Sequence, residues 1–335
     1  MLIFFIFLFK WFFFCTFATM DKIFQFRDIS TYRSEMMGWS IVWIMMLHFS
    51  FYSLKPLGFV AQYGYAGVEI FMFVSGFGLF YSLDKAPRFR EFYLKRLIRI
   101  FPAYYIVGVF ASIWVFHDTI LHYLFRYTTI GFWTGGLYYE WYVPSIMLLY
   151  LLAPFLKQIG VKGQSALAVG FLVASFFLLG RDDLVDGVHF FFVYRVPAFL
   201  FGMICAQWHK NNASMKWFLC IALVGIPFFI WLYPKFHQVY IYKYYSVLFL
   251  MPVFIIVLIV ISKYIKVLNP LMRIIGSASL EIYLVQNVMF CQMINGLIPR
   301  SDVSSLLLIT LSSIVGILIH LGIERIIAVC HEVCR

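Results

Sequence analysis

Two titratable residues lie inside long apolar stretches, and their types suit proton transfer. His48 follows MMGWSIVWIMML, and Glu69 lies in GYAGVEIFMFVSGF. An ionisable group within a membrane-spanning segment costs free energy, so it is a candidate functional residue. A carboxylate beside an imidazole can fix the ring's tautomer and stabilise its charged form, which would make His48 a general base. The alternative is a structural hydrogen bond between two helices.

The expected depths of these two residues favour a contact. His48 lies about ten to twelve residues into one apolar run, which corresponds to about 15–18 Å along a helix. Glu69 lies about one turn into the next run, which would pass back through the membrane as a hairpin. The sequence therefore predicts His48 and Glu69 at nearly the same depth.

A basic cluster follows in FREFYLKRLIRIFPAYY, where Lys95 flanks Arg96 and Arg99. The two arginines are three residues apart and so share one helix face. Positive residues at the cytoplasmic end of a helix commonly set orientation only. This cluster contains more basic residues than orientation alone requires. Guanidinium groups match the geometry of phosphate oxygens. The expected partner is a phosphate-rich cytoplasmic ligand, such as a nucleotide or coenzyme, or else an anionic lipid headgroup.

Other polar residues lie at or inside predicted helices. Glu140 and Trp141 begin one helix, and Arg195 lies just inside another, in FFVYRVPAFLFG. These three are candidates for binding a substrate, although Arg195 could simply extend to the outer interface. Further polar positions in the last two helices are Glu281, Gln286, His320 and Glu324.

No metal site is predicted. Most of the six cysteines fall in apolar runs, where cysteine is usually a small buried residue. Cys330, His331 and Cys334 share a helix end, but the fourth ligand of a closed site is missing.

The composition indicates an integral membrane protein. The chain is 63% hydrophobic and 12% charged, whereas soluble domains are about 45–50% apolar and about 25% charged. The apolar runs are continuous and about twenty residues long, which favours helices over the alternating strands of a barrel. We therefore expect one all-α domain, residues 20–335, with about ten core spans. The runs lie at 37–54, 65–83, 99–116, 141–156, 164–180, 190–208, 215–233, 244–262, 273–296 and 304–328.

An additional hydrophobic segment, residues 1–19, precedes this domain. It lacks the basic start and the small-residue cleavage site of a signal peptide. It is either an extra anchor helix or the product of an upstream start codon, because Met20 opens an ordinary cytoplasmic segment. On the second interpretation, removing residues 1–19 leaves function intact.

Lysine and arginine concentrate in alternate loops, which predicts cytoplasmic ends for the core and a multi-pass location in the cell membrane. The formal net charge of +11 is therefore mainly a topology signal. Nucleic acid is not an expected partner, because the basic residues flank spans and form no single patch.

With these segments in view, the chain resembles the acyltransferase 3 family of membrane O-acyltransferases from about Arg33 to Glu324. The pieces that carry the resemblance, in order, are RSEMMGWSIVWIMMLHFSF, GVEIFMFVSGFGLFYSL, FYLKRLIRIFPAYY, WYVPSIMLLYLLAPFL, RVPAFLFGMICA and SLEIYLVQN. The resemblance implies about ten core helices. It also implies transfer of an acyl group, usually acetyl, from acyl-coenzyme A to a sugar hydroxyl of a surface polysaccharide or glycolipid. Acyl-coenzyme A would be a donor substrate, with no permanently bound cofactor.

The resemblance also implies roles for individual residues. His48 matches the presumed catalytic base, and Glu69 stands where many members have aspartate. The Lys95–Arg99 segment matches the basic stretch that meets the donor's phosphates. Arg195 matches the arginine before the PAFLxG run.

Two positions depart from the family pattern. Many members have an arginine eleven positions before the histidine, where this chain has Met37. Arg33 lies fifteen positions before His48, faces roughly the same side about one turn lower, and is the remaining candidate for that donor-binding role. Gln286 replaces a histidine found in some members, and we expect it only to pack or hydrogen-bond.

The expected reaction places the donor's phosphates on the basic cluster and the acceptor sugar, free or lipid-linked, near His48. His48 would remove the hydroxyl proton, and Glu69 would stabilise the imidazolium. A polytopic transporter of a lipid-linked glycan or acyl compound is the alternative, because intramembrane His and Glu also suit proton relays. Against it, no inverted repeat is apparent. A non-catalytic scaffold is a third possibility.

Overall fold

In the computed structural model, the residues described are 24–51, 54–85, 88–134, 140–178, 188–232 and 240–333. Every regular element within these ranges is helical, as the sequence predicts. The hydrophobic segment 1–19 lies outside the described residues, as do Cys334 and the side chain of His331.

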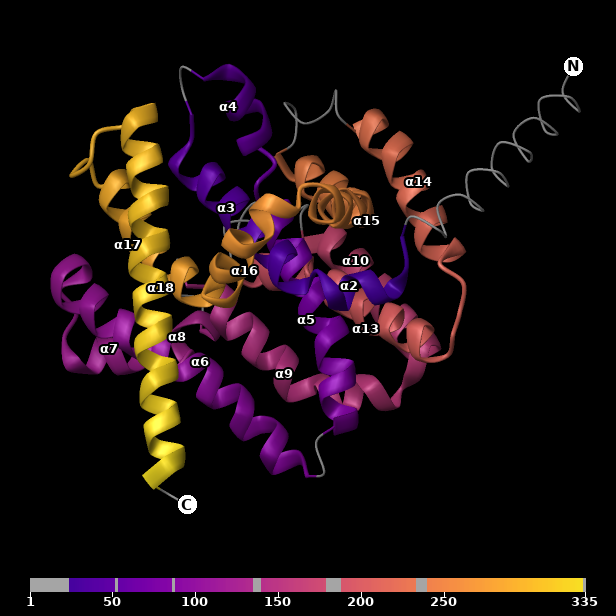
Figure 1. The fold of residues 1–335 in the computed structure, drawn as a ribbon, viewed down its shortest axis with the longest axis horizontal. Helices are drawn as coiled ribbons and strands as arrows, with labels where there is room; N and C mark the ends of the chain where they lie inside the picture. The colour runs from indigo at the N-terminus through magenta and orange to yellow at the C-terminus, as the bar shows by residue number, and fades with distance from the viewer. Residues whose placement is uncertain are drawn as a thin grey trace, which may run out of the picture.

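Four helices form the centre of the bundle (Figure 1). The most extensive contact joins α5 (Ala66–Lys85) to α13 (Val196–Lys210), and the next joins α3 (Arg33–Phe49) to α16 (Asn269–Ser277). α3 also packs against α5, so the four helices form one continuous core. The candidate base and its predicted partner are thus carried by two central helices.

Small residues explain why these helices approach so closely. A Cβ atom on Gly76 of α5 would collide with the backbone of Phe199 on α13, and one on Gly202 would collide with the backbone of Phe73. Gly38 and Gly276 are in equally close contact between α3 and α16. Glycine therefore permits backbone-to-backbone packing at both main contacts.

The remaining helices surround this core. Near the start of the described chain, α2 (Phe26–Thr31) packs against α3 and α13, and α4 (Lys55–Ala61) packs against α3. The middle of the chain forms α6 (Phe89–Ala111), the π-helix η1 (Ser112–Phe116), α7 (Ile120–Tyr127), α8 (Ile130–Trp133), α9 (Tyr142–Gln158), α10 (Gly160–Leu178) and α12 (Val188–Val193). The last third forms α14 (Lys216–Leu232), α15 (Tyr240–Tyr264), the short 3₁₀ helix η3 (Lys266–Leu268), α17 (Ser279–Ile294) and α18 (Asp302–Val333).

Five helical segments in the described part of the chain are long and apolar enough to cross a membrane. They are Ala66–Lys85, Phe89–Phe116, Phe191–Lys210, Tyr244–Tyr264 and Asp302–Cys330. A sixth is possible if Lys266–Ser277 and Ser279–Ile294, which meet at 73°, form one broken span. The predicted count of about ten spans is not confirmed.

The difference has local causes. α3, α9 and α14 have 17 residues each, at the lower limit for a span. The first core helix is expected to continue to residue 54, but α3 ends at Phe49. It ends there because Ser50 has a positive φ of 60°, which is not helical. The single run expected over 273–296 breaks at Ala278 between α16 and α17.

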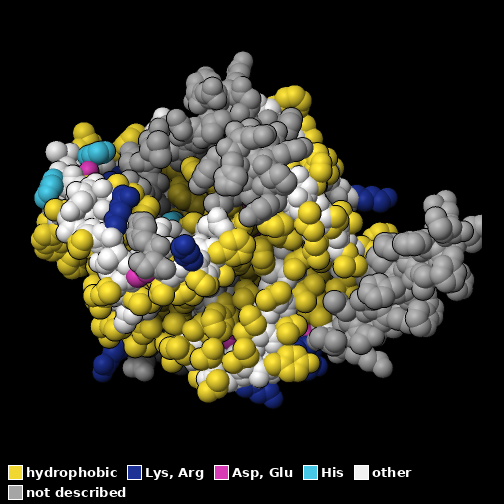
Figure 2. Space-filling model, turned by 90° about the horizontal axis from the view of Figure 1, so that it is seen from above, with side chains coloured by type: hydrophobic (Ala, Val, Ile, Leu, Met, Phe, Trp, Pro, Cys, Tyr) yellow, Lys and Arg dark blue, Asp and Glu magenta, His cyan; other side chains and the backbone are white. Residues whose placement is uncertain are grey.

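The surface agrees with a membrane protein. Hydrophobic side chains cover most of the described surface in view in Figure 2, and charged side chains are sparse on it. α18, yellow in Figure 1, runs along one side of the bundle and exposes large apolar residues such as Leu307 and Leu318. Such a surface is stable when lipid chains surround it.

Candidate active site

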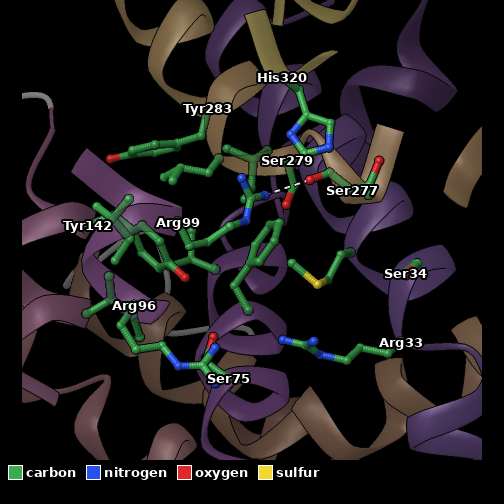
Figure 3. A pocket seen from close by; sticks show the side chains of 18 of the residues that line it. Arg33, Ser34, Ser75, Arg96, Arg99, Tyr142, Ser277, Ser279, Tyr283 and His320 are labelled. Atoms are coloured by element: carbon green, nitrogen blue, oxygen red, sulfur yellow. Dashed lines mark hydrogen bonds between the residues drawn. The ribbon is translucent and has the colours of Figure 1, made fainter. Parts of the chain in front are cut away.

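A cavity of about 500 Å³ opens between α3, α5, α6, α9, α16, α17 and α18. Arg33, Arg96 and Arg99 line it, and in Figure 3 the side chain of Arg33 from α3 and those of Arg96 and Arg99 from α6 extend into the same space. Hydroxyl groups complete a polar lining, contributed by Ser34, Ser75, Ser277, Ser279, Tyr142, Tyr150 and Tyr283. The structure therefore brings together three of the four predicted donor-binding residues.

Two of these arginines have no carboxylate partner among the described residues. Arg96 donates a hydrogen bond to the Ser82 hydroxyl and lies over the rings of Phe92 and Tyr150, at 5.5 and 5.9 Å. Arg33 forms no ion pair among the described residues, and its guanidinium lies next to Gly78 of α5. Their charges remain available to an anion in the cavity.

Arg99 is held differently. Its Nη1 atom lies 2.6 Å from Oε1 of Glu281, and Nη2 donates to the Ser277 carbonyl at 2.6 Å. The same Glu281 oxygen lies 3.2 Å from Nδ1 of His320, which lines the cavity. A fully buried carboxylate therefore joins an arginine and a histidine in the cavity wall. Lys95, by contrast, is exposed and does not line this cavity.

His48 has a partner other than the one expected. Nδ1 of His48 lies 2.7 Å from Oε1 of Gln286, and the imidazole stacks on Phe290 with ring centroids 4.7 Å apart. The predicted contact with Glu69 is wrong. Gln286 does hydrogen-bond, as the sequence predicts, and its partner is the candidate base.

Glu69 pairs with Arg195. Oε1 of Glu69 and Nε of Arg195 are 3.2 Å apart, and the two residues are 0% and 2% exposed. The guanidinium also lies 4.3 Å from the ring centroids of Trp141 and Tyr194. Arg195 is therefore buried inside the bundle, and the alternative in which its side chain extends to an outer interface is not favoured. The pair joins α5 to the start of α13. Its two charges compensate one another, as buried charges must if they are to be stable.

Glu140 belongs to a separate buried network. It accepts hydrogen bonds from Arg126 at 3.1 Å and from the Tyr127 hydroxyl at 3.4 Å. Burial raises the pKa of the Tyr127 phenol, so this hydroxyl stays protonated and can donate. Arg126 also packs over Phe116 at 3.6 Å and lies 3.7 Å from Asp118. Glu140 therefore fixes α7 to the start of α9 and does not line the arginine cavity.

His48 does not line the cavity but lies one helical turn beyond a residue of α3 that does. Ile44, four residues before His48 on the same face of α3, lines the cavity, and so does Tyr283, three residues before Gln286. The two helix faces that form the inner wall therefore continue to the His48–Gln286 contact. The distance from Arg33 to His48 along α3 is about 22 Å.

The His320–Glu281–Arg99 cluster was missed as a unit. Both Glu281 and His320 stand out in the sequence as polar residues in apolar helices. Their contact joins α17 to α18, and Arg99 comes from α6. Their residue types marked Glu281 and His320 as candidate functional residues. The spacing of residues along one helix could not show that Glu281 has partners on two other helices.

Within the described ranges, no group of three or more His, Cys, Asp or Glu side chains could hold a metal ion. The Cys330, His331 and Cys334 arrangement lies partly outside those ranges.

Comparison with known proteins identifies relatives. Residues 36–324 match the acyltransferase 3 family model, described as an acyltransferase domain. A protein of Acidianus two-tailed virus named "Putative acetyltransferase ORF330" is 25% identical over 196 residues. That match covers 54% of this chain and 59% of the viral protein, so the chain spans less than two thirds of that relative. No solved structure matches the chain.

Proposed function

Because the chain belongs to the acyltransferase 3 family and is an acyltransferase of a non-aminoacyl kind, we propose that it moves an acyl group, in the simplest case acetyl, from acyl-coenzyme A. The proposed acceptor is a sugar hydroxyl of a surface polysaccharide or of a lipid-linked glycan. We place the protein in the cytoplasmic membrane, with the arginine-rich end of the bundle and both ends of the core in the cytoplasm.

The observation that carries this proposal is the arginine cavity. Two guanidinium groups without carboxylate partners in the described chain, Arg33 and Arg96, line it beside Arg99. Guanidinium forks match phosphate oxygens, and a coenzyme A thioester carries several phosphates at one end of a long arm. With the phosphates at Arg33, the arm can extend along α3 toward His48, about 22 Å away.

His48 acts as the general base in this proposal. The acceptor hydroxyl gives its proton to the unprotonated ring nitrogen of His48 while its oxygen attacks the thioester carbonyl carbon. The C–S bond then breaks, the acyl group stays on the sugar oxygen, and the coenzyme leaves as a thiolate. The thiolate takes up the proton, which restores neutral His48. Glu69 stabilises the fold through Arg195 instead of assisting the base.

The experiment is a comparison of ester-linked acyl groups on the surface glycans of the host by mass spectrometry. Four strains are compared: with the gene, without it, with His48→Gln, and with the control His209→Gln, all expressed equally. His209 is outside the cavity and hydrogen-bonds Tyr81. Loss of one acyl group in the deletion and in His48→Gln, with retention in His209→Gln, supports the proposal. An unchanged acyl pattern in the deletion favours a transporter.

A further inference from the structure

We propose that Gln286 is the positioning residue for His48. It holds the imidazole as the tautomer that carries its proton on Nδ1, so Nε2 is the basic nitrogen. This inference rests on the proposed role of His48 and names the atom that performs it.

The contact geometry supports this tautomer. Oε1 of Gln286 is a carbonyl oxygen and can only accept, so the ring nitrogen 2.7 Å away must donate. The other end of the amide is also engaged, because Nε2 of Gln286 donates to Oδ1 of Asn287 at 2.6 Å. Turning the amide over would break both contacts. Gln286 is completely buried, so water does not offer an alternative partner.

This arrangement lies next to the cavity wall. Asn287, which accepts from Gln286, is one turn after Tyr283 on α17, and the Tyr283 ring packs against the Tyr142 ring with centroids 5.4 Å apart. Tyr283 and Tyr142 both line the arginine cavity. The Gln286 amide is therefore held between His48 and Asn287, one turn of α17 away from the cavity wall, and anchors the orientation of the base.

The second ring nitrogen and the ring face of the imidazole have different contacts. Phe290, one turn after Gln286, stacks on the ring with planes inclined by 19°, which fixes the ring plane. In the described part of the chain no hydrogen bond reaches Nε2, and His48 forms no ion pair. Gln286 and Phe290 from α17 are both neutral. The partner of the base is thus an amide, which orients the ring without the charge that a carboxylate would supply.

The first test measures the tautomer directly. ¹⁵N NMR of the histidine-labelled protein distinguishes protonated from unprotonated ring nitrogens, and the His48→Gln protein identifies the His48 signals. At a pH at which the ring is neutral, we expect a proton on Nδ1 and none on Nε2. A proton on Nε2 overturns the inference. Because this measurement needs no substrate, it is independent of whether the proposed reaction is correct.

The second test uses substitutions and donor turnover measured with acetyl-coenzyme A. Gln286→Met removes the acceptor at similar size and should lower kcat about 10- to 100-fold, with a nearly unchanged KM for the donor. Gln286→Glu keeps an acceptor at this position and adds a charge that favours the imidazolium. It should retain more activity than Gln286→Met, and the rise of activity with pH should move to higher pH. Gln292→Met is the matched control, because Gln292 is on the same helix and its side chain makes no hydrogen bond among the described residues.

Equal kcat values for Gln286→Met and Gln292→Met would contradict the inference. So would an unshifted pH profile in Gln286→Glu. If Gln286→Met does not fold, the NMR measurement of the His48 tautomer and the pH profile of Gln286→Glu still test the role of Gln286.

Discussion

Glu69 and Arg195 form a buried ion pair across the contact between α5 and α13, with Oε1 and Nε 3.2 Å apart. The pair assigns Glu69 a structural role, because its carboxylate is committed to a guanidinium and not to His48. The carboxylate–imidazole contact that the sequence placed at His48 and Glu69 occurs instead between Glu281 and His320, in the cavity wall.

Breaking the Glu69–Arg195 pair should destabilise the protein. Glu69→Ala leaves an uncompensated buried guanidinium, and we expect the free energy of unfolding to fall by about 3–5 kcal/mol. The double variant Glu69→Leu/Arg195→Met removes both charges and should recover much of this loss. Thermal unfolding in detergent measures both. A double variant no more stable than Glu69→Ala would show that the pair has no compensating role.

Removing either unpaired arginine should weaken donor binding. Arg33→Gln and Arg96→Gln each lose a charged hydrogen bond worth about 1.5–3 kcal/mol, so the Kd for acetyl-coenzyme A should rise about 10- to 100-fold. Arg90→Gln is the control, because Arg90 is exposed at the start of α6 and does not line the cavity. Equilibrium binding to purified protein measures the change. Equal Kd values for all three variants would place the phosphates elsewhere.

Glu281→Gln should change donor binding in the opposite direction. The substitution removes the negative charge that Arg99 and His320 share. The cavity then has a more positive potential, so the Kd for acetyl-coenzyme A should fall while thermal stability also falls. Increasing salt should reduce the gain in affinity. An increased Kd would mean that Glu281 serves the donor mainly by orienting Arg99.

Two glycines on α5 should respond differently to the same substitution. A Cβ at Gly76 would collide with the backbone of Phe199, whereas a Cβ at Gly78 would lie 3.5 Å from Cζ of Arg33, an ordinary contact. Gly76→Ala should therefore force α5 and α13 apart and lower the unfolding temperature, and Gly78→Ala should not. Size-exclusion profiles and thermal unfolding of the two proteins check this. Similar behaviour would contradict the close packing of α5 on α13.

Much of the architecture follows from the sequence. Long apolar runs and sparse charge predict an all-helical membrane bundle. The number of spans does not follow, because hydropathy does not show that α3 stops at Ser50 or that a bend of 73° divides the run over 273–296. Both features depend on backbone conformation that packing imposes.

The candidate site was predictable in its residue types but not in its pairings. The spacing of Arg96 and Arg99 predicts a shared face, and the structure directs both into the cavity with Arg33. The His48–Glu69 pairing relied on equal depth, which does not specify which helix lies beside each residue. The real partners come from α13 and α17, more than a hundred residues further along the chain.

The most direct test of the account compares three purified proteins in lipid nanodiscs: wild type, His48→Gln and His320→Gln. Each receives acetyl-coenzyme A and glycans extracted from the host membrane, and the released thiol is measured along with donor binding. We expect His48→Gln to release thiol about 10²- to 10⁴-fold more slowly than wild type while its donor Kd stays close to that of wild type. Undiminished thiol release by His48→Gln, together with its loss in His320→Gln, would contradict the account and assign the base to the His320–Glu281 pair.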